Sequence, residues 1–294
     1  MDFTNQIPAE ILPFLNVFVF IIGACVGSFF NVCIWRIPRD ESIVSPPSHC
    51  PKCGHLIPWH ENIPLVSWLA LRAKCSKCRI SISPRYFFVE LLTGYVFLLI
   101  WIKVLSSGQP IAFVFPYSFV AALVILTAFI DAEHSIIPNE ITYAGMIAGL
   151  CFSIIWPELW VQHRNWIMPE RLISFILSSG SLLISVLFMS FIALGGRYMF
   201  KKEALGWGDV KYIGAVAALI GIPACFFSLL FASLTGSVYG LSLIMLGKGK
   251  LRSAFPLGPF LAAGTIIWVF FGESIYESYV QMSNLVALKV SDGW

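Results

Sequence analysis

The chain has 294 residues, of which 58% are hydrophobic and 12% charged, and its mean hydropathy is +0.82. Ordinary soluble domains carry about a quarter charged residues, so this composition excludes a water-soluble core, a disordered chain, a collagen-like rod and a secreted disulfide scaffold. The formal net charge of +3 is too small to suggest a nucleic-acid partner. Repeated apolar stretches near the ~20 residues that cross a bilayer predict a polytopic membrane protein.

Eight apolar segments are candidate transmembrane helices, and together they predict an all-α fold. In chain order they cover roughly residues 14–35, 86–103, 111–130, 141–156, 172–194, 210–222, 224–246 and 259–271. The fourth, sixth and eighth are short, which suggests tilt mismatch, local thinning of the bilayer or burial beside a water-filled cavity. No basic residue precedes the first segment. It therefore lacks the n-region of a cleavable signal peptide, and we expect it to be retained.

The basic residues are distributed unevenly over the loops between these segments. When successive loops are placed alternately on the two sides of the membrane, 15 of the 19 lysines and arginines share one side, all but Lys103, Arg164, Arg171 and Lys289. Cytoplasmic loops are enriched in Lys and Arg. The bias therefore predicts that both termini lie outside the cytoplasm and that the loop between the first two segments is cytoplasmic. It also supports an even number of spans.

The eight cysteines form two groups. Four lie within apolar segments and are expected to be small packing residues: Cys25, Cys33, Cys151 and Cys225. The other four form two C-x2-C pairs in the first cytoplasmic loop, and 21 residues separate the pairs: Cys50, Cys53, Cys75 and Cys78. Two such pairs can place four thiolates tetrahedrally around one Zn²⁺, and a closed four-sulfur shell is structural because no position remains for water.

The alternative for these four cysteines is a pair of disulfides, which rarely persist in the reducing cytoplasm. His49, His55 and His60 lie close by and could replace a ligand, but we expect them to be ordinary polar loop residues. The zinc would hold together a Pro-rich loop that is too poor in apolar periodicity to build its own core. The sequence thus predicts three parts: a first transmembrane helix (1–35), a cytoplasmic zinc-binding loop domain with four cysteine ligands (36–85) and a membrane domain of seven helices (86–294).

Acidic residues within or at the end of a span are costly to bury and are therefore candidates for function. Glu90 lies one turn into the second segment, Asp131 ends the third and Asp209 opens the sixth. Two predicted spans separate Asp131 from Asp209, so both lie on the cytoplasmic side and can meet. Paired carboxylates share a proton, which lets one activate water while the other acts as an acid toward a carbonyl. This chemistry suits peptide-bond hydrolysis.

The residues around Asp209 read Gly206-Trp207-Gly208-Asp209-Val210-Lys211. Gly206 and Gly208 would let the backbone pass close to an extended peptide, and we expect both glycines and Lys211 to support the site. On position alone, Asp209 could instead be a helix N-cap, and Asp131 could be a terminal residue that snorkels to the interface.

Other ionisable side chains lie near these candidates. Glu133 and His134 follow Asp131 and are expected to be solvated loop groups, although either could tune the pair. For Glu90, a role as the structural partner of a basic residue such as Arg85 is favoured over a catalytic role.

A set of motifs runs in order along nearly the whole chain. They are Gly27-Ser28-Phe29-Phe30-Asn31-Val32, the two cysteine pairs, the stretch 59–68, Ser83-Pro84-Arg85-Tyr86, Glu90-Leu91-Leu92, Ile130-Asp131-Ala132-Glu133, Ile137-Pro138-Asn139 and the Gly206–Lys211 stretch. With these motifs the sequence resembles the bacterial type IV prepilin peptidases, which are GxGD-type intramembrane aspartic proteases and are also called type II secretion prepilin peptidases.

This resemblance implies that Asp131 and Asp209 are the catalytic pair, on the cytoplasmic face of the bacterial inner membrane, with both termini periplasmic. The implied substrates are prepilins and pseudopilins, whose short basic leader is cut after a glycine. Many members also N-methylate the new N-terminal residue, usually Phe, from S-adenosylmethionine. The cysteine loop characterises those bifunctional members, so residues 36–85 would be associated with methylation and 86–294 with proteolysis. No glycine-rich fingerprint places the methyl donor.

A different class of function is also compatible with the residues. In a polytopic transporter or assembly scaffold, the two aspartates would relay ions or protons, and the zinc loop would be a docking module. Transporters commonly contain internal repeats, and no convincing self-similarity is visible in this sequence. The sequence does not indicate an oligomeric state.

Overall fold

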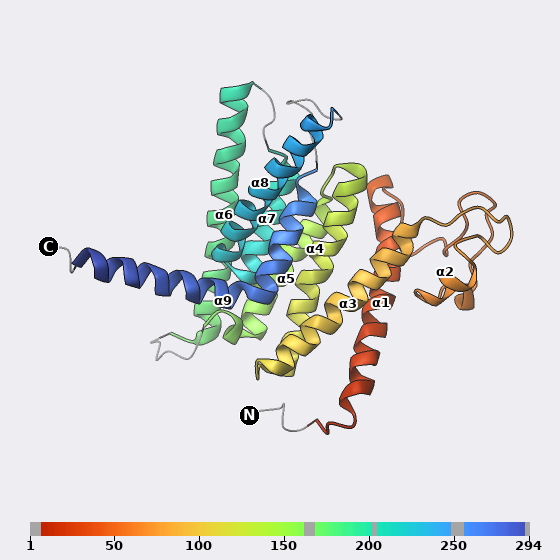
Figure 1. Cartoon of the computed structure of the whole chain (residues 1–294), viewed down its shortest axis with the longest axis horizontal. Helices are drawn as coiled ribbons and strands as arrows, with labels where there is room; N and C mark the ends of the chain where they lie inside the picture. The colour runs from red at the N-terminus through yellow and green to blue at the C-terminus, as the bar shows by residue number, and fades with distance from the viewer. Residues whose placement is uncertain (1–6, 162–167, 202–204, 248–255, 292–294) are drawn as a thin grey trace. The chain divides into compact units, whose positions relative to one another are not determined.

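The computed structural model describes residues 7–161, 168–201, 205–247 and 256–291. Five residues of the charge analysis lie outside these ranges: Arg164, Lys202, Lys248, Lys250 and Arg252. The described chain is helical (Figure 1). Its α-helices are α1 (Leu12–Arg36), α2 (Val66–Ala70), α3 (Pro84–Ser106), α4 (Val114–His134), α5 (Asn139–Ile155), α6 (Glu170–Phe200), α7 (Trp207–Ile220), α8 (Ile222–Met245) and α9 (Gly258–Ser291).

Each of the eight predicted segments coincides with one of these helices, so the all-helical membrane fold is confirmed. Among the described residues, six helices are long and apolar enough to cross a membrane: α1, α3, α4, α6, α8 and α9. Helix α5 is a shorter apolar helix of 17 residues, and α7 has only 14. At 1.5 Å per residue α7 is about 21 Å long, less than the ~30 Å hydrocarbon core. The count of eight spans stays a prediction.

The prediction for the last segment was wrong about its length. Helix α9 has 34 residues and continues past Phe271, where the apolar run ends. The residues that follow include Glu273, Ser274 and Glu277. Such residues interrupt an apolar run, but their helix propensities are compatible with continued backbone hydrogen bonding. Hydropathy therefore marked the end of the apolar surface and not the end of the helix.

The chain divides into two compact units, Met1–Ile141 and Thr142–Trp294. In the first unit α1 and α3 pack backbone against backbone. A Cβ atom added at Gly23 would lie 2.8 Å from the Cα of Gly94, and one added at Gly27 would lie 2.8 Å from the Cα of Glu90. Gly23 and Gly27 form a G-x3-G pattern, which lets membrane helices approach closely. Asn31 strengthens the contact, since its Nδ2 donates to the Tyr86 carbonyl at 3.0 Å.

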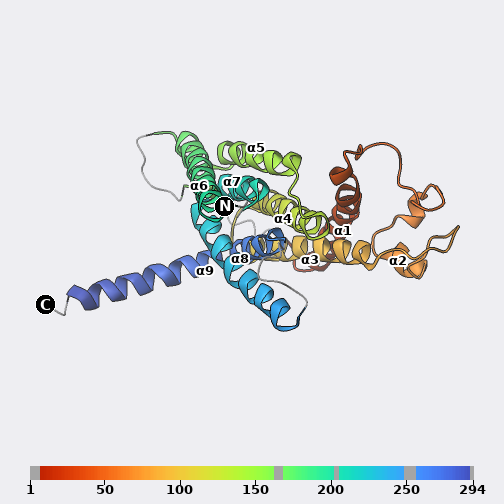
Figure 2. The same cartoon turned by 90° about the horizontal axis from the view of Figure 1, so that it is seen from above.

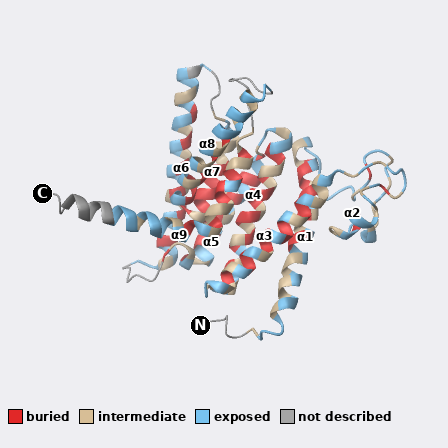
Figure 3. Ribbon diagram, viewed as in Figure 1, coloured by how far each residue is buried: buried red, intermediate tan, exposed pale blue. Residues whose placement is uncertain are grey.

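In the second unit α7 is the buried helix. Apart from Lys211, its residues from Val210 to Leu219 are buried, and Figure 3 shows the concentration of buried residues there. A Cβ atom added at Gly149 of α5 would lie 2.5 Å from the Ala218 carbonyl carbon. The α6 side chain of Ser178 donates to the same carbonyl group at 2.8 Å. Packing on small residues thus fixes the helix that begins at the Gly206–Asp209 motif.

Candidate functional site

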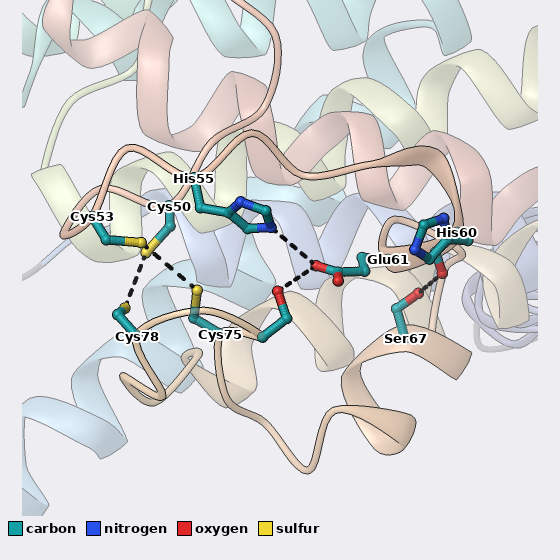
Figure 4. A network of polar contacts seen from close by, with 9 residues as sticks. Cys50, Cys53, His55, His60, Glu61, Ser67, Cys75 and Cys78 are labelled. Atoms are coloured by element: carbon teal, nitrogen blue, oxygen red, sulfur yellow. Dashed lines mark hydrogen bonds and ion pairs between the residues drawn. The ribbon is translucent and has the colours of Figure 1, made fainter.

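The four cysteines of the first loop converge on one point (Figure 4). Their Sγ atoms all lie within 4.8 Å of one another. The distance is 3.8 Å between the sulfurs of Cys50 and Cys78 and 4.0 Å between those of Cys53 and Cys75. A tetrahedral site with Zn–S bonds of about 2.3 Å requires sulfurs about 3.8 Å apart. The donor set and its spacing therefore fit a tetrahedral metal ion, as the sequence predicted.

Two copies of the same backbone turn hold these sulfurs. The Cys50 N–H donates to the His55 carbonyl at 2.9 Å, and the Cys75 N–H donates to the Ile80 carbonyl at the same distance. The residue after the second cysteine of each turn is left-handed, with φ of +67° in the first and +59° in the second. Each turn is flanked by an isolated antiparallel bridge in the same register. The symmetry places two thiols on each side of one centre.

The electrostatics of the cluster favour a bound cation. The backbone N–H of Cys53 is the main group that lowers the pKa of Cys50, to about 6. The backbone N–H of His55 acts in the same direction on Cys53, but desolvation and the neighbouring sulfurs outweigh it and raise the pKa of Cys53 to about 11. Four thiolates repel one another at this separation, so a divalent cation is needed to hold all of them deprotonated.

The alternatives to a metal site of four cysteines are not realised in this loop. All four cysteines are unbridged, and the candidate metal-binding group contains no histidine. His55 instead lies with its Nε2 3.8 Å from Oε2 of Glu61, which also accepts the Ser76 hydroxyl at 2.8 Å (Figure 4). That the loop histidines are ordinary polar residues stays a prediction, and this contact of His55 is consistent with it.

The loop is attached to α3 through α2 and the turn before it. The Leu65 N–H donates to Oε2 of the buried Glu90 at 2.7 Å. Leu65 itself is strained, with φ 63° and ψ −48°, and the Val66 N–H bonds to the Pro64 carbonyl across it at 2.6 Å, which is a γ-turn. The ring of Trp68 packs 5.2 Å from that of Phe87. Glu90 therefore anchors the loop to the membrane helix.

This contact corrects the expectation that Glu90 pairs with Arg85. Five residues on a helix correspond to about 140° of rotation, so the two side chains do not share a face. The Arg85 guanidinium pairs instead with the carboxylate of Glu133 on α4. Glu133 also lies 3.9 Å from Nε2 of His134. Glu133 is thus a tether between α3 and α4, while its side chain remains exposed, as expected for a solvated group.

Asp131 lies in the last turn of α4 and is buried, with 6% of its surface exposed. Its carbonyl accepts the N–H of Ser135, whose left-handed conformation ends the helix directly behind the carboxylate. The Arg85–Glu133 pair fixes the same turn, because Glu133 is only two residues away. The buried position excludes a side chain that merely snorkels to water.

Asp209 lies in the first turn of α7, whose N-cap is Gly206. It is therefore not the N-cap itself, although the positive end of the helix dipole still favours its negative charge. A Cβ atom added at Gly206 would lie 3.2 Å from Oδ2 of Asp209, so glycine leaves space for this carboxylate. The ammonium of Lys211 lies 5.4 Å from the ring centroid of Tyr143. The role of Gly208 stays a prediction.

Sequence reasoning missed a buried polar network one turn after Asp209. The Tyr212 hydroxyl lies 3.0 Å from the Thr265 hydroxyl, which lies 3.1 Å from that of Ser228. These contacts join α7 to α9 and α8. The spacing of Tyr212 three residues after Asp209 was the available signal. Asp131 belongs to the first unit and Asp209 to the second, so their meeting stays a prediction.

Two family models match the chain. The Bacterial Peptidase A24 N-terminal domain matches residues 21–104, and the Type IV leader peptidase family matches residues 118–241, which contain both aspartates. A prepilin leader peptidase/N-methyltransferase from Myxococcus xanthus is 39% identical over 253 residues, or 84% of this chain and 68% of the relative. Proteins of the same name from Aeromonas hydrophila and Pseudomonas aeruginosa are 32% and 30% identical.

The alignment with the Aeromonas hydrophila protein covers 89% of this chain and 92% of that relative. For the Pseudomonas aeruginosa protein the shares are 90% and 93%. No solved structure matches. The matched regions include the cysteine loop, α3 with Glu90, and the helices that carry Asp131 and Asp209. The chain therefore belongs to the type IV leader peptidase family.

Proposed function

We propose that this enzyme removes the leader of type IV prepilins and pseudopilins and N-methylates the new N-terminal residue, usually Phe. The observation that carries the proposal is similarity to prepilin leader peptidase/N-methyltransferases over nearly the whole chain, including both the cysteine loop and the two aspartate motifs. Six apolar helices and the family support a multi-pass protein of the bacterial inner membrane.

Asp131 and Asp209 carry out the hydrolysis. One carboxylate takes a proton from water, whose oxygen attacks the scissile carbonyl carbon, while the other acid protonates the carbonyl oxygen. Collapse of the tetrahedral intermediate breaks the C–N bond. The leaving amine takes the proton that the first carboxylate received from water, and the carbonyl oxygen returns its proton to the other carboxylate. The burial of Asp131 and the space that Gly206 leaves beside Asp209 support this assignment. Gly208 would admit the peptide backbone, and Lys211 would fix the first turn of α7 through Tyr143.

The cysteine loop holds one structural Zn²⁺ through Cys50, Cys53, Cys75 and Cys78, because the four sulfurs have tetrahedral spacing and no position remains for water. S-adenosylmethionine supplies the methyl group for the amine that proteolysis exposes. The loop and both aspartates face the cytoplasm and both termini face the periplasm. The excess of basic residues in the loops on that side supports this orientation.

The deciding experiment is co-expression with a prepilin, followed by analysis of leader cleavage and of the mass of the new N-terminus. Asp131→Asn and Asp209→Asn should each abolish cleavage while the protein stays in the membrane. The matched control is Asp40→Asn, an exposed acid outside the helices that carry the pair, and it should cleave normally. Wild-type cleavage by either dyad variant would contradict the two-aspartate mechanism, whereas absence of cleavage by the wild-type protein would favour an ion-relay transporter or scaffold.

A further inference from the structure

Helix α2 is held beside the first turns of a membrane helix. The Leu65 N–H bonds to Glu90 at 2.7 Å, and Trp68 packs on Phe87. Glu90 is six residues past the start of α3, which corresponds to about 9 Å along the helix axis. Figure 1 and Figure 2 both show α2 beside the beginning of α3. Because α3 is one of the candidate membrane spans, its first turns are expected near the membrane boundary, and α2 lies beside them.

The outer face of α2 is apolar. Val66 and Leu69 are each 58% exposed, and residues three apart lie on one face of a helix. Trp59, in the short helical turn Trp59–Glu61 of the same loop, is 81% exposed. Exposed apolar side chains are unfavourable in water but stabilising at the boundary between headgroups and acyl chains, where tryptophan is also enriched. The bilayer surface is the environment that matches this face.

A basic pocket begins where α2 ends. A cavity of about 440 Å³ is lined by Ala70, Leu71, Arg72, Lys74 and Arg79. All three cationic residues are exposed. Within the part of the chain that the structure describes, the ion pairs join other residues, and none involves these three. Like charges that line one cavity repel each other, so a bound anion would lower the electrostatic free energy of this pocket.

The backbone builds this pocket. Arg72 and Ala73 are left-handed, with φ of +50° and +55°, and the Ala73 N–H bonds back to the Trp68 carbonyl at 2.8 Å. The chain therefore reverses directly after α2. An antiparallel bridge between Lys74 and Ser81 then brings the two sides of the second cysteine turn together. The cations are thus presented by a defined turn next to the apolar face of α2.

We propose that this pocket binds the phosphate of an anionic phospholipid headgroup, while Val66 and Leu69 enter the boundary between headgroups and acyl chains. A lipid, rather than a soluble anion, is the occupant because the pocket adjoins an apolar face at the depth of α3's first turns. Basic residues near a bilayer surface each contribute about 1 kcal/mol of attraction to anionic lipids. Lipid binding would fix the position of the cysteine loop at the membrane independently of the peptidase aspartates.

The test uses the purified full-length protein in detergent. Native mass spectrometry would compare retention of phosphatidylglycerol and of phosphatidylcholine with the same acyl chains. The test variant is R72Q/K74Q. The matched control is K52Q/K77Q, which removes the same charge from the equivalent exposed position of each cysteine turn, outside the cavity lining. A third arm adds inorganic phosphate as a soluble competitor. An unchanged thermal unfolding midpoint would show that each variant is folded.

The wild type should retain phosphatidylglycerol in preference to phosphatidylcholine. This preference should fall about 10- to 30-fold in R72Q/K74Q. In K52Q/K77Q it should stay within about twofold of the wild-type value. Inorganic phosphate should not displace the lipid. If R72Q/K74Q unfolds, K74Q alone should lose about fivefold. Equal retention in wild type and R72Q/K74Q, or an equal loss in the control, would overturn the proposal. Displacement by inorganic phosphate would identify a soluble-anion site instead and would also overturn it.

Discussion

The contact between Glu90 and Leu65 gives a quantitative prediction. Glu90→Leu places an apolar side chain of similar volume in the interface of α1 and α3 but removes the acceptor of the Leu65 N–H, which is 2.7 Å away. A part-buried donor that loses its partner costs about 1–3 kcal/mol. The strained γ-turn at Leu65, with φ 63°, would then lose the contact that holds it. We therefore expect the turn and α2 to open locally.

Hydrogen exchange followed by mass spectrometry measures this opening. Since 1.4 kcal/mol corresponds to a factor of ten, the peptide that contains Leu65 should exchange roughly 5- to 150-fold faster in Glu90→Leu. Peptides from α4 should not change. Glu90→Gln is the control, because its amide oxygen can still accept the N–H, and its exchange should stay close to that of wild type. If exchange at Leu65 is the same in Glu90→Leu and wild type, Glu90 does not anchor the loop.

Three further changes test other parts of the structure. The backbone N–H of Cys53 is the main group that lowers the pKa of Cys50 from 9.0 to about 6, so the stabilising contribution of the Cys50 thiolate is complete above about pH 9 and is lost as the pH falls through 6. Protons compete with zinc for thiolates, so zinc affinity, measured by competition with a chelating dye, should fall as the pH is lowered, and a pH-independent affinity would contradict thiolate ligation. Gly27→Ala would place a Cβ 2.8 Å from the α3 backbone and should destabilise the protein by about 1–3 kcal/mol in thermal unfolding, whereas Gly180→Ala, with no atom within 4 Å, should not. Tyr212→Phe removes a buried hydroxyl contact of 3.0 Å and should cost about 0.5–1.5 kcal/mol; an unchanged unfolding midpoint would contradict its role in joining α7 to α9.

Properties that depend on neighbouring residues in the chain could be predicted from the sequence. Hydropathy located the eight apolar helices because apolar side chains must be continuous along a segment that meets lipid. The spacing of the cysteines was sufficient to predict their cluster, since each C-x2-C pair forms a compact turn on its own. The position of Asp209 behind two glycines likewise indicated an open first turn, and the structure shows Gly206 beside its carboxylate.

The tertiary structure decided the partners. Glu90 binds the Leu65 amide, and Arg85 binds Glu133, because α2 and α4 pack on the two sides of α3 that carry these side chains. The length of α9 was also outside what hydropathy can indicate, since helical hydrogen bonds continue where apolar surface stops. Partner choice depends on which helix faces approach closely, and a contact such as Gly27 against the α3 backbone sets that approach. These distances exist only after the helices have packed.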